Sequence, residues 1–254
     1  MNDAAKIAAL ETGIYLGDAI DLIRLLPNGS VDLVSADPPY NTSRPNNMHT
    51  MGRGGFNFGW DGNFDQLEWL KEIVPKVREG GSLVIWNDWK NLGLMDAALV
   101  ELNCEAKRVL LWQKSNPMPR NKNRVPVQGH EFAIWAVKKG AKWTFNQTPG
   151  LGYDTGEFTY PIPRAPSGRE RHPSKKPDEM FQHIIRMFSN PRDLVVDPFA
   201  GGGTTAYAAA VEGRRHISFE LSMKWHAEAV EHWLESPAPP AVVQLGGLSE
   251  EGAA

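Results

Sequence analysis

Apolar and polar positions along the chain follow two periods, which together predict an α/β fold. Short apolar runs bounded by turn residues indicate buried strands, whereas apolar positions three or four residues apart indicate amphipathic helices. The predicted strands cover 13–16, 31–36, 82–86, 109–112, 132–137, 194–197 and 216–219. The predicted helices cover 19–26, 65–77, about 90–102, 177–188, 206–212 and 222–234. Strands that alternate with helices are typical of a largely parallel sheet.

The strands at 109–112 and 132–137 interrupt this alternation, because no helix is predicted between them. The connecting segment 113–129 is polar, basic and broken by prolines. Two strands that are joined without a crossover helix pair in the antiparallel sense. We therefore expect an antiparallel hairpin with a long basic connection, and we expect irregular surface chain over 148–174, which is rich in Gly, Pro and Arg.

Two segments show neither the strand pattern nor the helix pattern of apolar positions. Residues 41–63 hold five glycines and three aromatic residues, and a long loop of this kind in a compact domain is usually functional, so we expect a mobile loop beside the strand at 31–36. Residues 236–254 are rich in Pro and Gly, which predicts a disordered tail. The remaining pattern predicts a single domain over 1–235.

Composition agrees with a globular protein of the cytoplasm. Of the 254 residues, 41% are hydrophobic and 22% are charged, which suffices for a sizeable core. The apolar runs fall short of the roughly 18 residues that suggest a membrane span, and the first six residues lack the apolar core of a signal peptide. The single cysteine, Cys104, excludes an internal disulfide and a cysteine-cluster metal site.

Charge is unevenly distributed. The net charge is −3, which argues weakly against a nucleic-acid partner. Between Glu105 and Phe145, however, nine basic residues stand against two acidic ones, a local excess of +7. A basic patch in an acidic chain is the footprint of a nucleic-acid site, and a solvated face is the equally weighted alternative. The basic residues are Lys107, Arg108, Lys114, Arg120, Lys122, Arg124, Lys138, Lys139 and Lys142.

The turn Asp37-Pro38-Pro39-Tyr40 closes the strand predicted at 31–36. Two successive prolines cannot continue the hydrogen-bond ladder of a central strand, so the strand stops abruptly. A carboxylate and an aromatic ring are therefore held on a stiff turn at the carboxyl end of a strand. Ligands bind at this edge of open α/β sheets, which makes the turn a candidate site.

A second candidate site lies far downstream, where a strand ending at Asp197 meets a glycine turn. Gly201, Gly203 and Ala206 fit the spacing G-x-G-x-x-G/A after a strand, and Glu220 ends the next strand. Glycine lets the backbone approach a bulky ligand, and an acid at that position can accept both ribose hydroxyls. The unit predicts a nucleoside cofactor, with a plain strand-to-helix turn as the alternative.

The chemistry of the two sites narrows the choice of nucleoside. ATP is disfavoured, because a phosphate-binding loop needs Gly-Lys-Ser/Thr and here Thr204 follows Gly203 directly. NAD fits the glycine spacing but gives the turn at 37–40 no role. S-adenosylmethionine gives it one, since it carries a transferable methyl group beside an ammonium, a carboxylate and a ribose.

The two motifs together resemble those of the amino-group DNA methyltransferases. Their order, with Asp-Pro-Pro-Tyr first and Asp197-Pro-Phe-Ala-Gly-Gly-Gly-Thr-Thr205 last, is similar to the β group of that family. Gly17-Asp18 resembles the family's short acidic turn, and His172-Pro-Ser-Lys-Lys-Pro177 its His-Pro-x-x-Lys-Pro element. The resemblance implies a methyltransferase fold with a mostly parallel, seven-stranded sheet, one antiparallel hairpin and a circularly permuted motif order.

The resemblance also implies the reaction, methylation of the N6 amino group of a flipped adenine in double-stranded DNA. The catalytic residues would be Asp37, Pro38, Pro39 and Tyr40. Tyr40 would stack on the base, while Asp37 and the carbonyl of Pro38 would accept hydrogen bonds from its amino group, and no metal is involved. Asp at the first position resembles adenine-N6 enzymes, whereas Ser is usual in cytosine-N4 enzymes. Cytosine-N4 or RNA methylation, and a non-enzymatic nucleic-acid-binding protein on this fold, are the alternatives.

The same resemblance implies which residues bind S-adenosylmethionine. Phe199 would border its adenine, Glu220 its ribose and Lys176 its carboxylate, and Asp18 either binds the cofactor or caps its own helix. The expected set is Asp18, Ala36, Asp37, His172, Lys176, Asp197, Phe199, Gly201, Gly203, Thr204, Thr205 and Glu220.

Recognition of DNA is expected in two segments, 115–128 and 148–171. Arg120, Lys122, Asn123 and Arg124 are the candidate contacts, because basic side chains bind phosphates and amide side chains can read base edges. Members of this group often dimerise, so a homodimer is a further expectation from the resemblance.

Overall fold

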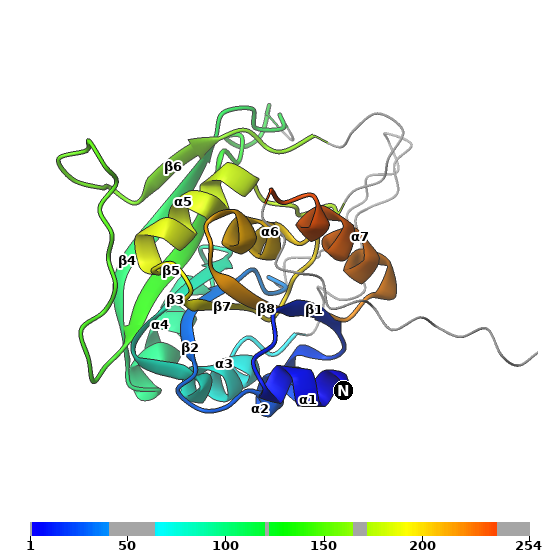
Figure 1. The fold of residues 1–254 in the computed structure, drawn as a ribbon. Helices are drawn as coiled ribbons and strands as arrows, with labels where there is room; N and C mark the ends of the chain where they lie inside the picture. The colour runs from blue at the N-terminus through cyan, green and yellow to red at the C-terminus, as the bar shows by residue number, and fades with distance from the viewer. Residues whose placement is uncertain (1, 41–63, 120–121, 165–171, 238–254) are drawn as a thin grey trace, which may run out of the picture.

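The computed structural model describes residues 2–40, 64–119, 122–164 and 172–237 (Figure 1). The predicted mobile loop 41–63, the tail from 238 onward and Arg120 lie outside the described residues. The strands are β1 (Gly13–Leu16), β2 (Val31–Ala36), β3 (Val77–Asn87), β4 (Cys104–Lys114), β5 (His130–Lys138), β6 (Glu157–Tyr160), β7 (Leu194–Asp197) and β8 (Arg215–Glu220). The helices are α1 (Asp3–Ala8), α2 (Ala19–Leu25), α3 (Glu68–Ile73), a 3₁₀ turn η2 (Val74–Lys76), α4 (Leu92–Glu101), α5 (Asp178–Phe188), α6 (Thr204–Val211) and α7 (Met223–Leu234).

The described strands form one sheet in the order β1-β8-β7-β2-β3-β5-β4-β6. β5 runs antiparallel to both of its neighbours, and every other neighbouring pair is parallel. The predicted mostly parallel sheet with an antiparallel hairpin is therefore confirmed. The hairpin strands are longer than their apolar cores indicated, because their polar ends continue the hydrogen-bond ladder from Gln113↔His130 to Cys104↔Lys138.

The predicted number of seven strands is wrong, because β6 makes an eighth. Residues 157–160 fall in the segment for which the sequence predicted irregular chain. They pair in parallel with the free edge of β4, from Leu111↔Glu157 to Lys114↔Tyr160. Phe158 is buried there, with its ring edge on the ring of His183 in α5. Four residues among Gly and Pro carry too weak a period to be recognised, and the edge of β4 supplies the missing partner.

The helix predicted over 65–77 ends early, and the chain that follows it, including Gly80 and Gly81, belongs to a strand. Pro75 lies in the 3₁₀ turn that follows α3, and β3 begins at Val77. Gly80 lies within β3 with a φ of +72°, and a Cβ there would be 2.5 Å from the carbonyl oxygen of Lys142. The pairing of β3 with β2 shifts register over this stretch, so glycine serves an irregular strand rather than a helix end.

Helices cover both faces of the sheet, as Figure 1 shows: α5, α6 and α7 on one face, α1 to α4 on the other. Trp69, Leu70 and Ile73 of α3 are fully buried on one face, and Ile184 and Ile185 of α5 on the other. Such two-sided burial explains why the central strands read as continuous apolar runs. None of the described helices has the length and apolarity to cross a bilayer.

The connections diverge between the neighbouring strands β7 and β2. After β7 the chain passes through α6 to β8 on one side, whereas after β2 it passes through α3 to β3 on the other. This divergence is a topological switch point, where the loops separate and leave a crevice at the carboxyl ends of the strands. Asp37 follows β2 and Asp197 ends β7, so the two motifs face each other across this crevice.

One buried histidine on β8 has a consequence for stability. His216 is fully buried, its ring lies 4.7 Å from that of Trp233, and neither ring nitrogen has a hydrogen-bond partner among the described residues. Burial lowers the pKa of His216 to about 3. The folded state thus binds fewer protons than the unfolded state as the pH falls below the ordinary histidine value, and stability is lost there.

We expect the variant His216→Phe to gain stability relative to wild type by about 1.4 kcal/mol per pH unit as the pH falls from about 6 to 5. Asp197 contributes with the opposite sign, because burial raises its pKa to about 7 and protonation then favours the folded state. The difference between the two proteins isolates the histidine. Urea unfolding at several pH values measures it, and parallel pH slopes would contradict the prediction.

Candidate active site

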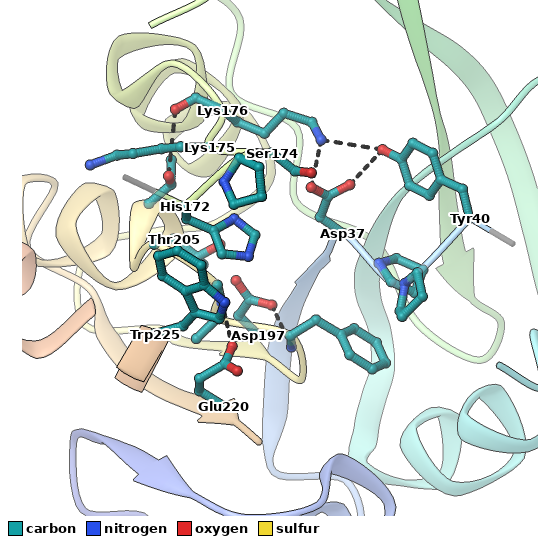
Figure 2. Close-up of a pocket in the computed structure, with 18 of the residues that line it drawn as sticks. Asp37, Tyr40, His172, Ser174, Lys175, Lys176, Asp197, Thr205, Glu220 and Trp225 are labelled. Carbon is teal, nitrogen blue, oxygen red and sulfur yellow. Dashed lines mark hydrogen bonds and ion pairs between the residues drawn. The ribbon is translucent and has the colours of Figure 1, made fainter. Parts of the chain in front are cut away.

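The carboxyl ends of four strands open into one cavity of about 800 Å³. Each strand delivers an acidic residue to its wall: Asp18 just after β1, Asp37 just after β2, Asp197 at the end of β7 and Glu220 at the end of β8. Figure 2 shows Asp37, Asp197 and Glu220 lying along the cavity, with Tyr40 on the far side of Asp37. A cavity with several acidic groups suits a ligand that carries cations and hydroxyl groups.

Buried amides hold the turn at 37–40 in place. The side chain of Gln66 donates a hydrogen bond to the carbonyl of Pro39, and Gln66 itself accepts from Asn87 at 2.8 Å. Asn91 donates to the carbonyl of Tyr40 at 3.1 Å and to Asn87 at 2.7 Å. These contacts fix a turn whose prolines have no N–H of their own to donate. No sequence motif predicts this network, because its amides lie on separate elements.

The carboxylate of Asp37 has a donor on each oxygen. The hydroxyl of Tyr40 donates to Oδ1 at 2.5 Å, and the ammonium of Lys176 donates to Oδ2 at 2.5 Å. The Lys176 Nζ also lies 3.2 Å from the Tyr40 hydroxyl, so the three groups form a closed cluster (Figure 2). Burial raises the pKa of Asp37, while the neighbouring Lys176 ammonium acts against that rise.

Lys176 is held by a second carboxylate that the sequence had not singled out. Its Nζ lies 3.1 Å from Oε2 of Glu131, and Oε1 of Glu131 lies 2.7 Å from Nζ of Lys114. Burial alone would raise the pKa of Glu131, but the two ammonium groups outweigh it and hold that pKa below its ordinary value. The structure therefore places Lys176 against protein carboxylates rather than free to meet the carboxylate of a cofactor.

The glycine turn after β7 is built around Glu220. The carboxylate accepts hydrogen bonds from the backbone N–H of Gly201 at 2.9 Å and of Ser222 at 2.8 Å. Gly201 has a φ of +50°, and a Cβ there would be 3.1 Å from the ring of His172. Gly203 has a φ of +76°, and a Cβ there would be 2.7 Å from the carbonyl oxygen of Ala229 in α7. The two glycines thus serve different purposes: Gly201 lines the cavity, and Gly203 lets α6 approach α7.

Ten of the twelve predicted cofactor residues line the cavity, and two do not. Ala36 is fully buried in the core, and the space that a Cβ of Gly203 would take is occupied by α7. The carboxylate of Asp18 caps α2 by accepting the N–H of Ile20, and Asp18 also lines the cavity, where its contact with the cofactor stays a prediction. The ten are Asp18, Asp37, His172, Lys176, Asp197, Phe199, Gly201, Thr204, Thr205 and Glu220.

Aromatic residues shape the wall of this cavity. The ring of Phe199 meets Phe64 and Trp69 edge-on, with centroids 5.4 and 5.3 Å apart, and this contact fixes its orientation. The ring of His172 lies edge-on to that of Trp225 at 5.0 Å. Trp225 lines the cavity but was not predicted, since a tryptophan on a helix carries no motif of its own.

The basic region between Glu105 and Phe145 does not form one patch. Lys107, Arg108, Lys138 and Lys139 lie where β4 begins and β5 ends, at the edge of the sheet opposite the cavity. Lys107 pairs there with Glu105 and lies over the ring of Trp143, and Lys138 donates to backbone carbonyls. Lys114 lies at the cavity but pairs with Glu131. The excess of basic residues in the sequence therefore overestimated the size of the basic surface that could bind a nucleic acid.

The connection between β4 and β5 keeps the remaining candidates for DNA contact. Lys122, Asn123 and Arg124 are exposed on it, and the next residues along the chain, Val125 and Pro126, line the cavity. The neck of this connection is closed by a backbone hydrogen bond of 2.7 Å from Lys114 to Gly129. Exposed cationic residues thus stand beside the mouth of the cavity.

Comparison with known proteins gives consistent matches. A family described as DNA methylase (N6_N4_Mtase) matches residues 31–231. The type II methyltransferase M.HinfI of Haemophilus influenzae is 28% identical over 92% of this chain and 72% of its own length. The crystal structure of an M1.HpyAVI–SAM complex superposes with a TM-score of 0.69 at 32% identity, covering 86% of this chain and 97% of the other. The cytosine-N4-specific PvuII DNA methyltransferase shares the fold, with a TM-score of 0.70 at 20% identity over 89% of this chain and 87% of the other. These matches confirm the fold that the motifs implied.

Proposed function

Since this chain belongs to the DNA methylase family, we propose that it transfers a methyl group from S-adenosylmethionine to the N6 amino group of adenine in double-stranded DNA. The observation that carries the proposal is the switch-point cavity. It brings the Asp37–Tyr40 turn of β2 opposite the glycine turn of β7, so that an acceptor for an amine faces a nucleoside site.

The residues around the cavity fit S-adenosylmethionine, which supplies an electrophilic methyl group when it is bound. Glu220 ends β8 with its carboxylate in the cavity wall, where it suits ribose hydroxyls. Gly201 leaves room for close approach of the backbone, and the ring of Phe199 is held on edge by its aromatic neighbours. Asp18 supplies negative charge for the cationic groups of the cofactor.

Asp37 and Tyr40 suit an exocyclic amine as the acceptor of the methyl group. The lone pair of such an amine is delocalised into the ring, so the amine is a weak nucleophile. Asp37 accepts its N–H, directs the lone pair and stabilises the positive charge that develops on nitrogen. Because burial raises the pKa of Asp37, the same carboxylate is also suited to take up the proton that the methylated amine releases.

Binding of the base requires that it leave the DNA stack, because the cavity is recessed. Tyr40 stacks on the flipped ring, a contact worth roughly 1–3 kcal/mol. We assign phosphate contacts to the exposed Lys122 and Arg124 and a base-edge contact to the exposed Asn123. Arg120 belongs to the same connection and is assigned the same role from the sequence. The homodimer stays a prediction.

The test of the proposed function follows the methyl group. We expect wild-type protein, incubated with methyl-labelled S-adenosylmethionine and mixed double-stranded DNA, to place the label in N6-methyladenine after digestion to nucleosides. Label in N4-methylcytosine would refute the adenine assignment while retaining the family chemistry. In a parallel reaction that contains RNA, label in RNA but none in the DNA reaction would refute DNA as the substrate. No label in either reaction, despite cofactor binding, would favour a non-enzymatic protein.

A further inference from the structure

Four charged side chains form a continuous series of ion pairs along one wall of the cavity. The series runs from Lys114 to Glu131 at 2.7 Å, from Glu131 to Lys176 at 3.1 Å and from Lys176 to Asp37 at 2.5 Å. Lys176 is 5% exposed, and none of the other three side chains is more than 20% exposed. Two carboxylates and two ammonium groups balance, so the series is neutral as a whole.

Each carboxylate oxygen of Asp37 thus already accepts one hydrogen bond before a substrate is bound. Tyr40 occupies Oδ1 and Lys176 occupies Oδ2. A carboxylate oxygen can accept a second hydrogen bond, so an incoming amine either shares an oxygen with one of these donors or displaces it. An ammonium that stayed at 2.5 Å from Asp37 would repel the positive charge that develops on the amine nitrogen. The departure of Lys176 therefore favours the reaction more than the departure of a neutral hydroxyl.

We propose that Glu131 is a positioning residue that takes over the Lys176 ammonium when the target amine binds Asp37, and that Lys114 holds Glu131 in place for this exchange. The inference rests on the proposed function, because it concerns the same amine. Oε2 of Glu131 is already 3.1 Å from Nζ of Lys176 and is buried, and no described residue other than Lys176 pairs with it. It therefore has capacity for a closer ammonium.

The elements that carry these residues suit the exchange. Glu131 and Lys114 stand on the paired strands β5 and β4, where Trp112, the direct cross-strand partner of Glu131, is anchored by a 2.9 Å hydrogen bond to Tyr160. Lys176 stands before α5 on the irregular segment that follows residue 171, and its long side chain can shift its head without moving the backbone. The carboxylate of Glu131 is thus held in place, and the ammonium of Lys176 is the group that moves.

Removing one member of the series shifts the charge around Asp37 in a defined direction. Glu131→Gln leaves Lys176 with Asp37 as its only carboxylate partner in the series, so the ammonium is held on Asp37 and the site gains one positive charge. Lys114→Gln removes one of the two ammonium groups that pair with Glu131, so the site gains one negative charge. Glu131 is among the groups that raise the pKa of Asp37, together with burial. The two substitutions should therefore move that pKa in opposite directions.

The first experiment measures kcat, KM for DNA and the binding constant for S-adenosylmethionine of both variants across pH. We expect Glu131→Gln to lower kcat by about tenfold or more, with the acidic limb of its pH profile moved to lower pH. We expect Lys114→Gln to move that limb to higher pH, with a smaller loss at the plateau. The other groups that face Asp37 are Tyr40 and, across the cavity, Asp197, and both are unchanged in these variants.

Two controls separate positioning from folding. Glu105→Gln removes the exposed carboxylate that pairs with Lys107 at the far end of the same hairpin and should leave kcat and the pH profile unchanged. The double variant with Glu131→Gln and Lys114→Gln restores neutrality and should return the acidic limb toward its wild-type pH, while the loss in kcat persists because no carboxylate remains to receive Lys176. If kcat falls but the acidic limb of the pH profile is unshifted in both variants, Glu131 has only a structural role and the proposal is overturned.

A second measurement requires no turnover. NMR titration of isotope-labelled aspartate carboxyls, with the Asp37 signal assigned by Asp37→Asn, should show the pKa of Asp37 lowered in Glu131→Gln and raised in Lys114→Gln. An unshifted Asp37 signal in both variants would overturn the proposal even in an active enzyme. If the wild-type protein transfers no label while these shifts are present, the proposed function fails and the coupling of the four groups stands.

Discussion

The substitution Asp37→Asn is expected to reduce methyl transfer by on the order of 10³-fold, about 4 kcal/mol of transition-state stabilisation. Asparagine keeps the shape of the side chain but removes its charge. It keeps one oxygen acceptor and replaces the other with an NH₂ donor, so a single neutral oxygen remains for both the amine and the ammonium of Lys176, which lies 2.5 Å from the native carboxylate. Single-turnover incorporation of label into DNA measures the effect.

The binding of S-adenosylmethionine and the unfolding midpoint show whether this loss is chemical. Both should stay close to the wild-type values, because the turn remains anchored by Gln66 and Asn91. Asp21→Asn is the matched control, since Asp21 is an exposed acid of α2 whose ion partner, Arg24, is also exposed. A variant of Asp37 that kept more than about a tenth of the wild-type rate would contradict the proposed role.

The substitution Gly203→Ala is expected to destabilise the fold by about 2–4 kcal/mol and to weaken the binding of S-adenosylmethionine. A φ of +76° is unfavourable for alanine, and the new Cβ would lie 2.7 Å from the backbone oxygen of Ala229. Neither α6 nor α7 can yield at this contact without moving the glycine turn. Urea unfolding and calorimetric titration with S-adenosylmethionine measure the two effects.

Gly213→Ala provides a closely matched comparison. Gly213 follows α6 with a φ of +71°, and a Cβ there would have no neighbour within 4 Å. Its substitution carries only the cost of the backbone conformation, about 1–2 kcal/mol, and leaves cofactor binding unchanged. The difference between the two variants isolates the close packing of α6 on α7. Equal losses would show that backbone conformation alone accounts for the effect.

The sequence predicted those parts of the fold and site whose causes are local. The apolar run 31–36 closed by two prolines predicts both β2 and the turn at its end, since proline acts on its own segment. Gly201 and Glu220 predict a nucleoside site because their spacing spans one strand-helix-strand unit. The antiparallel hairpin of β4 and β5 is predicted because no helix lies between their two apolar runs.

The parts that could not be predicted depend on contacts between distant segments. β6 is recognisable as a strand only where β4 offers an open edge. Glu131 reads as an ordinary acid of a basic stretch, and its importance arises because Lys176 arrives from 45 positions further along the chain. The charge count along the sequence likewise combined basic residues from both ends of β4. These residues are far apart in the fold, because the strand places its two ends at opposite edges of the sheet.

The single reversed strand has a consequence for how target choice can evolve. Because β5 runs against its neighbours, the connection from β4 both leaves and re-enters the sheet at the catalytic edge. The backbone bond between Lys114 and Gly129 ties its two ends together, so its length and composition can change without altering the strands beneath it. Under the recognition role proposed for this connection, exchange of the segment between relatives is expected to change sequence specificity and to leave the proposed methyl transfer intact.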